Sequence, residues 1–567
     1  MKKLIIGMLF CTVGFWSAPA QNPKWVDKAK RAVFSIITYD AQDKILNTGN
    51  GFFISDDGVA LSDYSLFKGA HKAVVLTSAG KQMTVDAILG ANELYDVIRF
   101  RVATDGKKVD ALKVAQNSPS ANVGFYLLPY STRKDRSFMN GTIKQVDPVA
   151  DNYQYYTLNL HLQDKMVSCP VVTAEGDVFG LAQKSSGQDT ATICYAVDAR
   201  FAQQQHISAL SYNDGSLRSI GIKKALPDTE EQALVFLYMV ASQVTPEVYG
   251  GLLEDFIQQY PTSADGYLRR ATHKLSQATD ENGMKAVVRD LDQALAVSKK
   301  KDDVYYNRAK MIYSYLLAKP DNTFKAWTFD GALEEIGKAI AMNPLPIYYQ
   351  LDGDIRFAKQ DYAGALASYE RLNQTNLKSA ANFFSIVRTK EMLKAPQEEV
   401  LALMDSCLAQ FTKPYTDAAA PYLLERAQRR VNGGKARLAV LDYDDYFKAV
   451  NGKVNDAYYY YHEQAALQAK QFQRALNDMA KAIELAPKEL TYRAELAVLN
   501  LRVGRNEEAL KVLNEALAID PNYAEAYRLK GVVYIQLKQS QKACSCFAKA
   551  KKMGDEHVDE LIRKHCK

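Results

Sequence analysis

The sequence predicts a two-part protein in which an all-β domain of short strands precedes a long all-α repeat. Two observations carry this prediction. Near the C-terminus, three segments that begin at Asp456, Leu490 and Ala524 repeat at a fixed period of 34 residues. In the N-terminal part, short β-branched runs such as 32–38 and 73–76 alternate with glycine turns, a pattern typical of strands in a barrel or sandwich.

The repeat places small residues at two fixed positions and a large apolar residue between them. The twentieth and twenty-seventh positions of each unit are alanine, and the twenty-fourth is Met479, Leu513 or Phe547. This pattern resembles the tetratricopeptide repeat, a pair of helices that cross closely at the small residues. Weaker copies extend upstream. The resemblance therefore implies an all-α tetratricopeptide-repeat solenoid of about eight or nine helical pairs over residues 228–555, with a capping helix or tail at 556–567.

Tetratricopeptide repeats typically bind other proteins in a groove lined by five positions of the first helix. In the three clear units, these positions include Tyr460, Gln464, Gln468, Thr491, Val498, Arg502, Glu525, Arg528 and Gln536. They do not match the lysine and asparagine clamp of chaperone-binding relatives, which argues against a conventional acidic C-terminal motif in the partner. Tyrosine and arginine are common hot spots, so we expect Tyr460, Arg502 and Arg528 to contribute most. We also expect alanine at these three positions to leave the fold nearly unchanged.

The β domain resembles trypsin-like serine proteases of the high-temperature-requirement type. The resemblance rests on the glycine-rich opening at 47–58, the segment 65–70, the strand at 93–100, and the loop and hairpin at 165–181. It covers residues 25–215 and implies an N-terminal trypsin-like double β-barrel, which we place at residues 21–220.

The positions of the catalytic triad in this family are degenerate here. Ser65 stands at the histidine position, Asp96 at the aspartate position and Val167 at the nucleophile position. Lys165 replaces a glycine whose N–H helps to form the oxyanion hole. An alignment shifted by one residue would place Ser168 at the nucleophile position, but a base would still be lacking. We therefore expect a pseudoprotease with no catalytic residues. The alternative is a serine-type peptidase with an unorthodox active site.

The N-terminus predicts export. Lys2 and Lys3 precede an apolar run at 4–16, and Ala18-Pro19-Ala20 is a small-residue cleavage signal, so residues 1–20 read as a bacterial signal peptide cleaved after Ala20. No later run reaches the ~18 apolar residues of a membrane-spanning helix. We expect a periplasmic protein, with secretion or association with the envelope as alternatives.

Cysteines and charge exclude further classes of function. The formal charge of +6 is spread without a basic stripe, so nucleic acid is not expected as a partner. Phosphate-loop, dinucleotide and zinc-protease motifs are absent from the sequence, and we expect no cofactor.

Cys169 and Cys194 could form a disulfide in the β domain or be two buried thiols. Cys566 could pair with Cys544 or Cys546, whose spacing is not that of a structural zinc site, and no metal is expected.

These observations together predict an exported, non-catalytic scaffold or adaptor that binds proteins or peptides in the cell envelope. A structural subunit of an envelope assembly fits the same sequence, and the oligomeric state is left open.

Overall fold

A computed structural model describes residues 23–132, 138–149, 152–184, 192–321 and 323–566. The predicted signal peptide, residues 1–20, lies outside the described residues. The chain divides into two compact units, residues 1–299 and 300–567.

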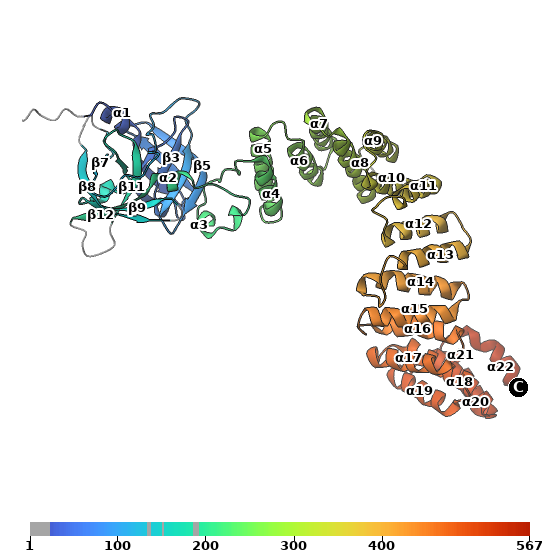
Figure 1. The fold of residues 1–567 in the computed structure, drawn as a ribbon. Helices are drawn as coiled ribbons and strands as arrows, with labels where there is room; N and C mark the ends of the chain where they lie inside the picture. The colour runs from blue at the N-terminus through green and yellow to red at the C-terminus, as the bar shows by residue number, and fades with distance from the viewer. Residues whose placement is uncertain (1–22, 133–137, 150–151, 185–191, 322, 567) are drawn as a thin grey trace, which may run out of the picture. The chain divides into compact units, whose positions relative to one another are not determined.

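The first unit contains twelve antiparallel strands that close into two six-stranded β-barrels (Figure 1). The first barrel has the order β1-β2-β3-β6-β5-β4, and the second has the order β10-β11-β12-β9-β8-β7. The strands of the first barrel are β1 (Val33–Tyr39), β2 (Ile45–Phe53), β3 (Val59–Ser62), β4 (Lys72–Thr77), β5 (Gln82–Asn92) and β6 (Val97–Val102). Those of the second are β7 (Gly124–Leu127), β8 (Met139–Pro148), β9 (Gln154–Asn159), β10 (Pro170–Val172), β11 (Val178–Gln183) and β12 (Ile193–Asp198).

Alternating side chains fill the interior of each barrel, as the period of two in a strand requires. In β1, Phe34 and Ile36 are fully buried in the first barrel. Phe125 and Phe179 occupy the core of the second barrel. A third apolar cluster, which includes Phe52 of β2, draws residues from strands of both barrels and packs the barrels against each other.

Helices make up the rest of the described chain. The first unit contains α1 (Val26–Arg31), α2 (Ala199–Gln203), α3 (Gly215–Arg218), α4 (Glu230–Val240), α5 (Pro246–Gln259), α6 (Ala264–Gln277) and α7 (Glu281–Val297). The second contains α8 (Lys301–Ala318), α9 (Phe329–Met342), α10 (Pro346–Ala358), α11 (Tyr362–Asn373), α12 (Ala380–Met392), α13 (Gln397–Leu408), α14 (Ala420–Asn432), α15 (Ala436–Ala449), α16 (Asp456–Gln468), α17 (Phe472–Leu485), α18 (Leu490–Arg502), α19 (Asn506–Ile519), α20 (Ala524–Gln536), α21 (Ser540–Lys552) and α22 (Asp559–His565). The predicted fold class, a double β-barrel followed by an all-α helical repeat, is confirmed.

The 34-residue period of the sequence appears directly in the helices. The first helices α16, α18 and α20 begin at the three residues that open the repeats. The alanines at positions twenty and twenty-seven are fully buried, as are Met479, Leu513 and Phe547 between them. Gly531 shows why small residues are needed, because a Cβ atom there would lie 2.2 Å from Phe547. Close approach of the two helices therefore fixes the repeat pattern.

A short terminal helix covers the last repeat. Leu561 and Ile562 of α22 pack against a buried cluster that includes Phe547 and Ala550 of α21. A disulfide between Cys544 of α21 and Cys566 ties this helix to the repeat, so that Cys566 pairs with the first of its two candidate partners. Both thiols are therefore unavailable to a metal ion.

The disulfide considered for Cys169 and Cys194 is not formed, and both thiols are free and buried. Cys169 directly precedes β10 and Cys194 lies on β12, with β11 paired between these two strands. Two strand spacings amount to roughly 9–10 Å, whereas a disulfide needs Cα atoms less than about 7 Å apart. The alternative interpretation, two small buried side chains, is the correct one.

Among the described residues, no helix is both long and apolar enough to cross a bilayer.

Candidate functional site

The two triad positions in the first barrel, Ser65 and Asp96, are hydrogen-bonded to each other. Ser65 lies in a 3-10 turn, η1 (Tyr64–Leu66), and Asp96 in the turn before β6. The Ser65 N–H donates to Asp96 Oδ1 at 2.6 Å, and the Ser65 hydroxyl donates to Asp96 Oδ2 at 3.0 Å. Asp96 thus orients Ser65, the residue at the histidine position. The Ser65 side chain is a hydroxyl, which cannot accept a proton near neutral pH as an imidazole does.

The loop at the nucleophile position is fixed from the first barrel. Val167 follows a 3-10 turn, η2 (Asp164–Met166), and its half-buried side chain packs on the core of the second barrel. The amide of Asn50, from β2, donates to the carbonyl oxygens of Lys165 at 3.0 Å and Val167 at 2.9 Å. Asn50 itself is buried, and its two part-buried bonds, the Asn50 clamp, stabilise one conformation of the loop.

In that conformation the N–H of Val167, at the nucleophile position, is already hydrogen-bonded within the loop. Catalysis of acyl transfer requires N–H groups aimed at the developing oxyanion. Here the N–H of Val167 donates to the carbonyl of Asp164 at 3.3 Å, and the N–H of Met166 donates to Gln163 at 2.8 Å. The N–H groups of Met166 and Val167 are therefore already bonded within the loop.

Ser168, the alternative nucleophile, and the neighbouring Cys169 are both buried. Ser168 has a left-handed backbone, with φ of 64°, and is 1% exposed. Its hydroxyl lies near the buried Asp63, whose pKa is raised well above its usual range by burial and by the charge of Asp96. Burial also raises the pKa of the Cys169 thiol to about 12. Neither Ser168 nor Cys169 has the exposure or activation that a nucleophile requires.

Comparison with protein families agrees with this architecture. Residues 49–181 match a model described as a trypsin-like peptidase domain, and residues 502–538 match a TPR repeat. The same chain therefore carries a trypsin-like peptidase domain and tetratricopeptide repeats, as the sequence predicts. A search of curated proteins finds no match.

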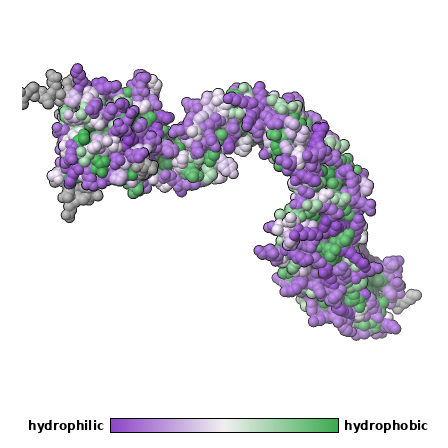
Figure 2. All heavy atoms as spheres, viewed as in Figure 1, coloured by the Kyte–Doolittle hydropathy of each residue, from purple (hydrophilic) through white to green (hydrophobic). Residues whose placement is uncertain are grey.

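The groove positions predicted from the repeats differ in exposure. Gln468, Arg502 and Gln536 are exposed, and Tyr460 and Gln464 are half-buried. The ring of Tyr460 lies 5.6 Å from that of Tyr492 on α18, which gives it a packing role between neighbouring units. The face of the second unit in view in Figure 2 is mainly hydrophilic, with scattered apolar positions.

Arg528 is bound within the protein, which corrects the expectation that its substitution would leave the fold unchanged. Its guanidinium bonds Asp555 at 2.7 Å and Glu525 at 2.6 Å. The Asp555 side chain is 6% exposed and also accepts the N–H of His557 at the start of the C-terminal cap. Removing Arg528 would leave a nearly buried carboxylate without its cation.

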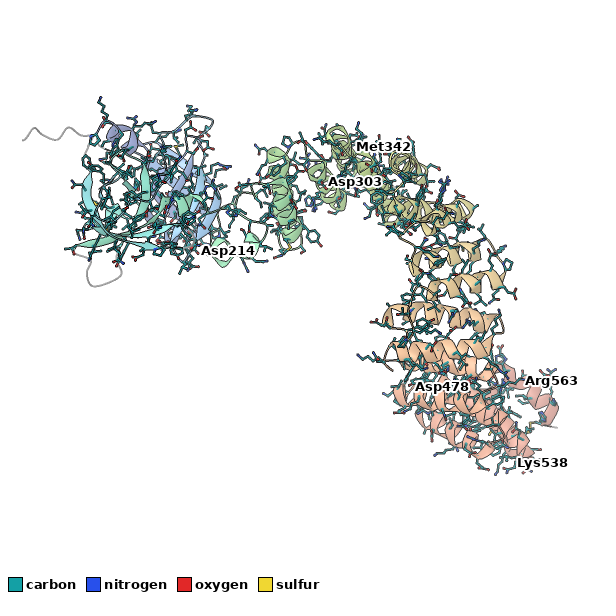
Figure 3. The ribbon with its side chains drawn as sticks, in the orientation of Figure 1. Asp214, Asp303, Met342, Asp478, Lys538 and Arg563 are labelled. Carbon is teal, nitrogen blue, oxygen red and sulfur yellow. A yellow bond between two sulfur atoms is a disulfide. The ribbon has the colours of Figure 1, made fainter. Side chains whose placement is uncertain are left out.

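A buried carboxylate at a packing position escaped the sequence analysis. The eighth position of the repeat is Ala497 or Gly531 in two units but Glu463 in the first. Glu463 is 0% exposed, and the Gln464 amide donates a hydrogen bond to its carboxylate at 2.7 Å. Burial, Glu495 and Asp478 raise its pKa to about 7; Asp478 is labelled in Figure 3. A comparison of position eight across the three units would have revealed it.

A second buried acid lies in the preceding repeat and is paired. Asp442 of α15 is 1% exposed and accepts from Arg426 at 2.6 Å and Arg430 at 2.8 Å, both on α14. The same arginines reach Asp405 of α13 at 2.7 and 3.2 Å. Three consecutive helices are thus joined by one charge network.

Proposed function

We propose that this chain is an exported, non-catalytic scaffold or adaptor that binds proteins or peptides in the cell envelope. The tetratricopeptide repeats supply the surface for protein interaction. The trypsin-like domain supplies a stable barrel pair whose cleft no longer performs proteolysis. Export, and with it a periplasmic location, rests on the leader at residues 1–20.

The Asn50 clamp is the observation that carries the non-catalytic part of this proposal. Loss of the nucleophile at Val167 and of the base at Ser65 removes the chemistry. The clamp also holds the loop where the Val167 N–H donates to Asp164. An unorthodox peptidase is less well supported, because its nearest nucleophile, Ser168, is 1% exposed.

We expect the purified mature chain to hydrolyse casein and fluorogenic peptides no faster than buffer. A fluorophosphonate probe, read by peptide mass spectrometry, should label neither Ser65 nor Ser168 above a heat-denatured sample. An active trypsin-like protease assayed in parallel shows that the probe and substrates work. Selective labelling of Ser168 in the folded protein would establish the peptidase alternative instead.

The binding part of the proposal predicts that exposed groove residues determine partner affinity. We expect the combined change Gln468→Ala, Arg502→Ala and Gln536→Ala to weaken binding at least about tenfold, since an interface arginine can contribute ~2 kcal/mol or more. The partner is first recovered from envelope extracts with the wild-type chain, identified by mass spectrometry, purified and titrated. Circular dichroism should show an unchanged fold, because all three side chains are exposed.

A matched control changes three exposed residues on second helices, Lys481→Ala, Lys511→Ala and Glu515→Ala. This variant should bind the partner like the wild type. If the groove variant also keeps wild-type affinity, the groove is not the binding site, and the barrels become the better candidate.

A further inference from the structure

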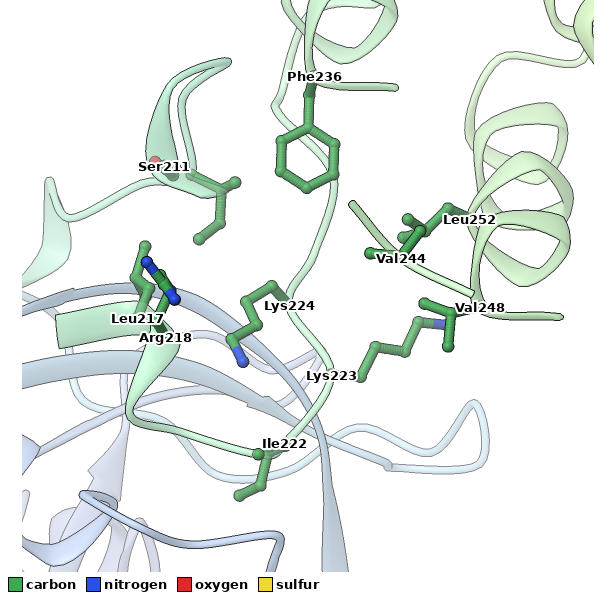
Figure 4. A pocket seen from close by; sticks show the side chains of 12 residues that line it. Ser211, Leu217, Arg218, Ile222, Lys223, Lys224, Phe236, Val244, Val248 and Leu252 are labelled. Carbon is green, nitrogen blue, oxygen red and sulfur yellow. The ribbon is translucent and has the colours of Figure 1, made fainter. Parts of the chain in front are cut away.

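A cavity of about 480 Å³ lies inside the first unit, between the segment that follows the second barrel and α2 and the helices α4 and α5 (Figure 4). Its walls are mainly apolar and include Leu217, Ile222, Phe236, Val244, Val248 and Leu252. The volume lies within the ~300–1,000 Å³ typical of small-molecule sites. Apolar walls of this size favour a ligand with a substantial hydrocarbon part.

The charged lining of the cavity has a single sign. Arg218, Lys223 and Lys224 line it, and among the described residues no carboxylate does. Lys223 is paired with Asp255 at 2.7 Å, whereas Lys224 is half-buried and donates to the carbonyl of Ile220. Burial lowers the pKa of Lys224. An ammonium group in such surroundings gains stability when an anion enters beside it.

The backbone along the cavity is already hydrogen-bonded to the barrel. The N–H of Gly221 donates to Ala70 at 2.7 Å, and the carbonyl of Lys223 accepts from Ile88 at 2.8 Å. The N–H of Ala225 donates back to Ile88 at 2.8 Å. These bonds fix the segment against the first barrel, and apolar side chains make up most of the cavity wall beside it, whereas a peptide would bring N–H and C=O groups that need partners. The cavity therefore favours a ligand with one charged end and few other polar groups.

We propose that this cavity binds a linear alkyl carboxylate, the free acid of a medium-length acyl chain. The carboxylate lies at Lys224 and Arg218, and the alkyl chain lies between Leu217 and Ile222 on one side and Phe236 and Leu252 on the other. Figure 4 shows the Lys224 side chain between these walls. The site is independent of the groove and of the triad positions.

Titration calorimetry of the full chain with decanoate, below its micellar concentration, tests the proposal. Decanoate should bind at one site, and decanol, which lacks the charge, should bind at least about tenfold more weakly, as expected for a charge-assisted hydrogen bond. Lys224→Met keeps the apolar stem and should weaken decanoate by a similar factor while leaving decanol unchanged. Lys107→Met, at an exposed lysine outside the cavity, should bind decanoate like the wild type.

A second variant guards against misfolding of Lys224→Met. Val248 is 53% exposed on α5 and lines the cavity, so Val248→Asp should fold and should repel decanoate. The proposal is overturned if decanoate does not bind, if decanol binds equally well, or if neither variant changes the affinity. It is also overturned if a peptide with an apolar C-terminal residue and a free carboxylate binds more tightly than decanoate.

Discussion

Replacing Asp442 with alanine is expected to destabilise the helices around it by about 3–5 kcal/mol, the usual cost of removing one partner of a buried ion pair. Arg426 and Arg430 would keep the carboxylate of Asp405, whose side chain is 56% exposed, and Arg430 would also keep its bond to the Leu438 carbonyl. The side chains of the two arginines are only 11% and 14% exposed, so water could not replace the lost carboxylate. Hydrogen exchange should rise across α14 and α15, and the melting temperature should fall.

Asp405→Ala is the matched control, because it removes a carboxylate from the same network at its exposed end. Exposed pairs contribute about 0–1 kcal/mol, so this variant should melt close to the wild type. Equal melting of the Asp442→Ala variant and the wild type would mean that α14 and α15 do not depend on the network.

The second large effect is a gain in stability on removing the charge of Glu463. A carboxyl whose pKa is about 7 in the folded chain and about 4.5 when unfolded binds its proton more tightly in the folded state. The Glu463 carboxyl therefore has no effect on the free energy of unfolding below about pH 4.5. It lowers that free energy increasingly as the pH rises toward 7, and its effect is constant at higher pH. At pH 8 the deficit is at most about 3 kcal/mol, and Glu463→Gln should recover it.

The measurement is the difference in unfolding free energy between Glu463→Gln and the wild type at pH 4.5 and pH 8. Using a difference removes the contributions of other titrating groups, such as Glu495 and Asp442, whose pKa values burial also raises. Glu515→Gln, at an exposed position of α19, should show no such change with pH. If Glu463→Gln and the wild type differ in unfolding free energy by the same amount at both pH values, Glu463 does not titrate between pH 4.5 and pH 8 in the folded chain.

Spacing in the sequence predicts which side chains share a helix face, and this explains what could be foreseen. The buried alanines, Phe547 and the starts of α16, α18 and α20 all follow from one period. The resemblance to proteases likewise led to Ser65 and Asp96, which the structure brings together.

The features that could not be foreseen depend on side chains that bond groups in another element, far away in the sequence. Asn50 clamps a loop more than a hundred residues away, and Arg528 finds Asp555 at the end of the chain. The repeat period of the sequence carries no information about such pairings. Cys169 and Cys194 were also ambiguous, because strand order, and not sequence separation, decides that β11 lies between them.

The Cys544–Cys566 bond has a practical consequence for preparing the protein. In a reducing cytosol both thiols stay free, and α22 is then held only by contacts such as those of Leu561 and Ile562. A repeat end without its cap presents the same kind of apolar surface that one repeat offers to the next. Two such chains can stack end to end, so material for binding measurements is best folded under oxidising conditions.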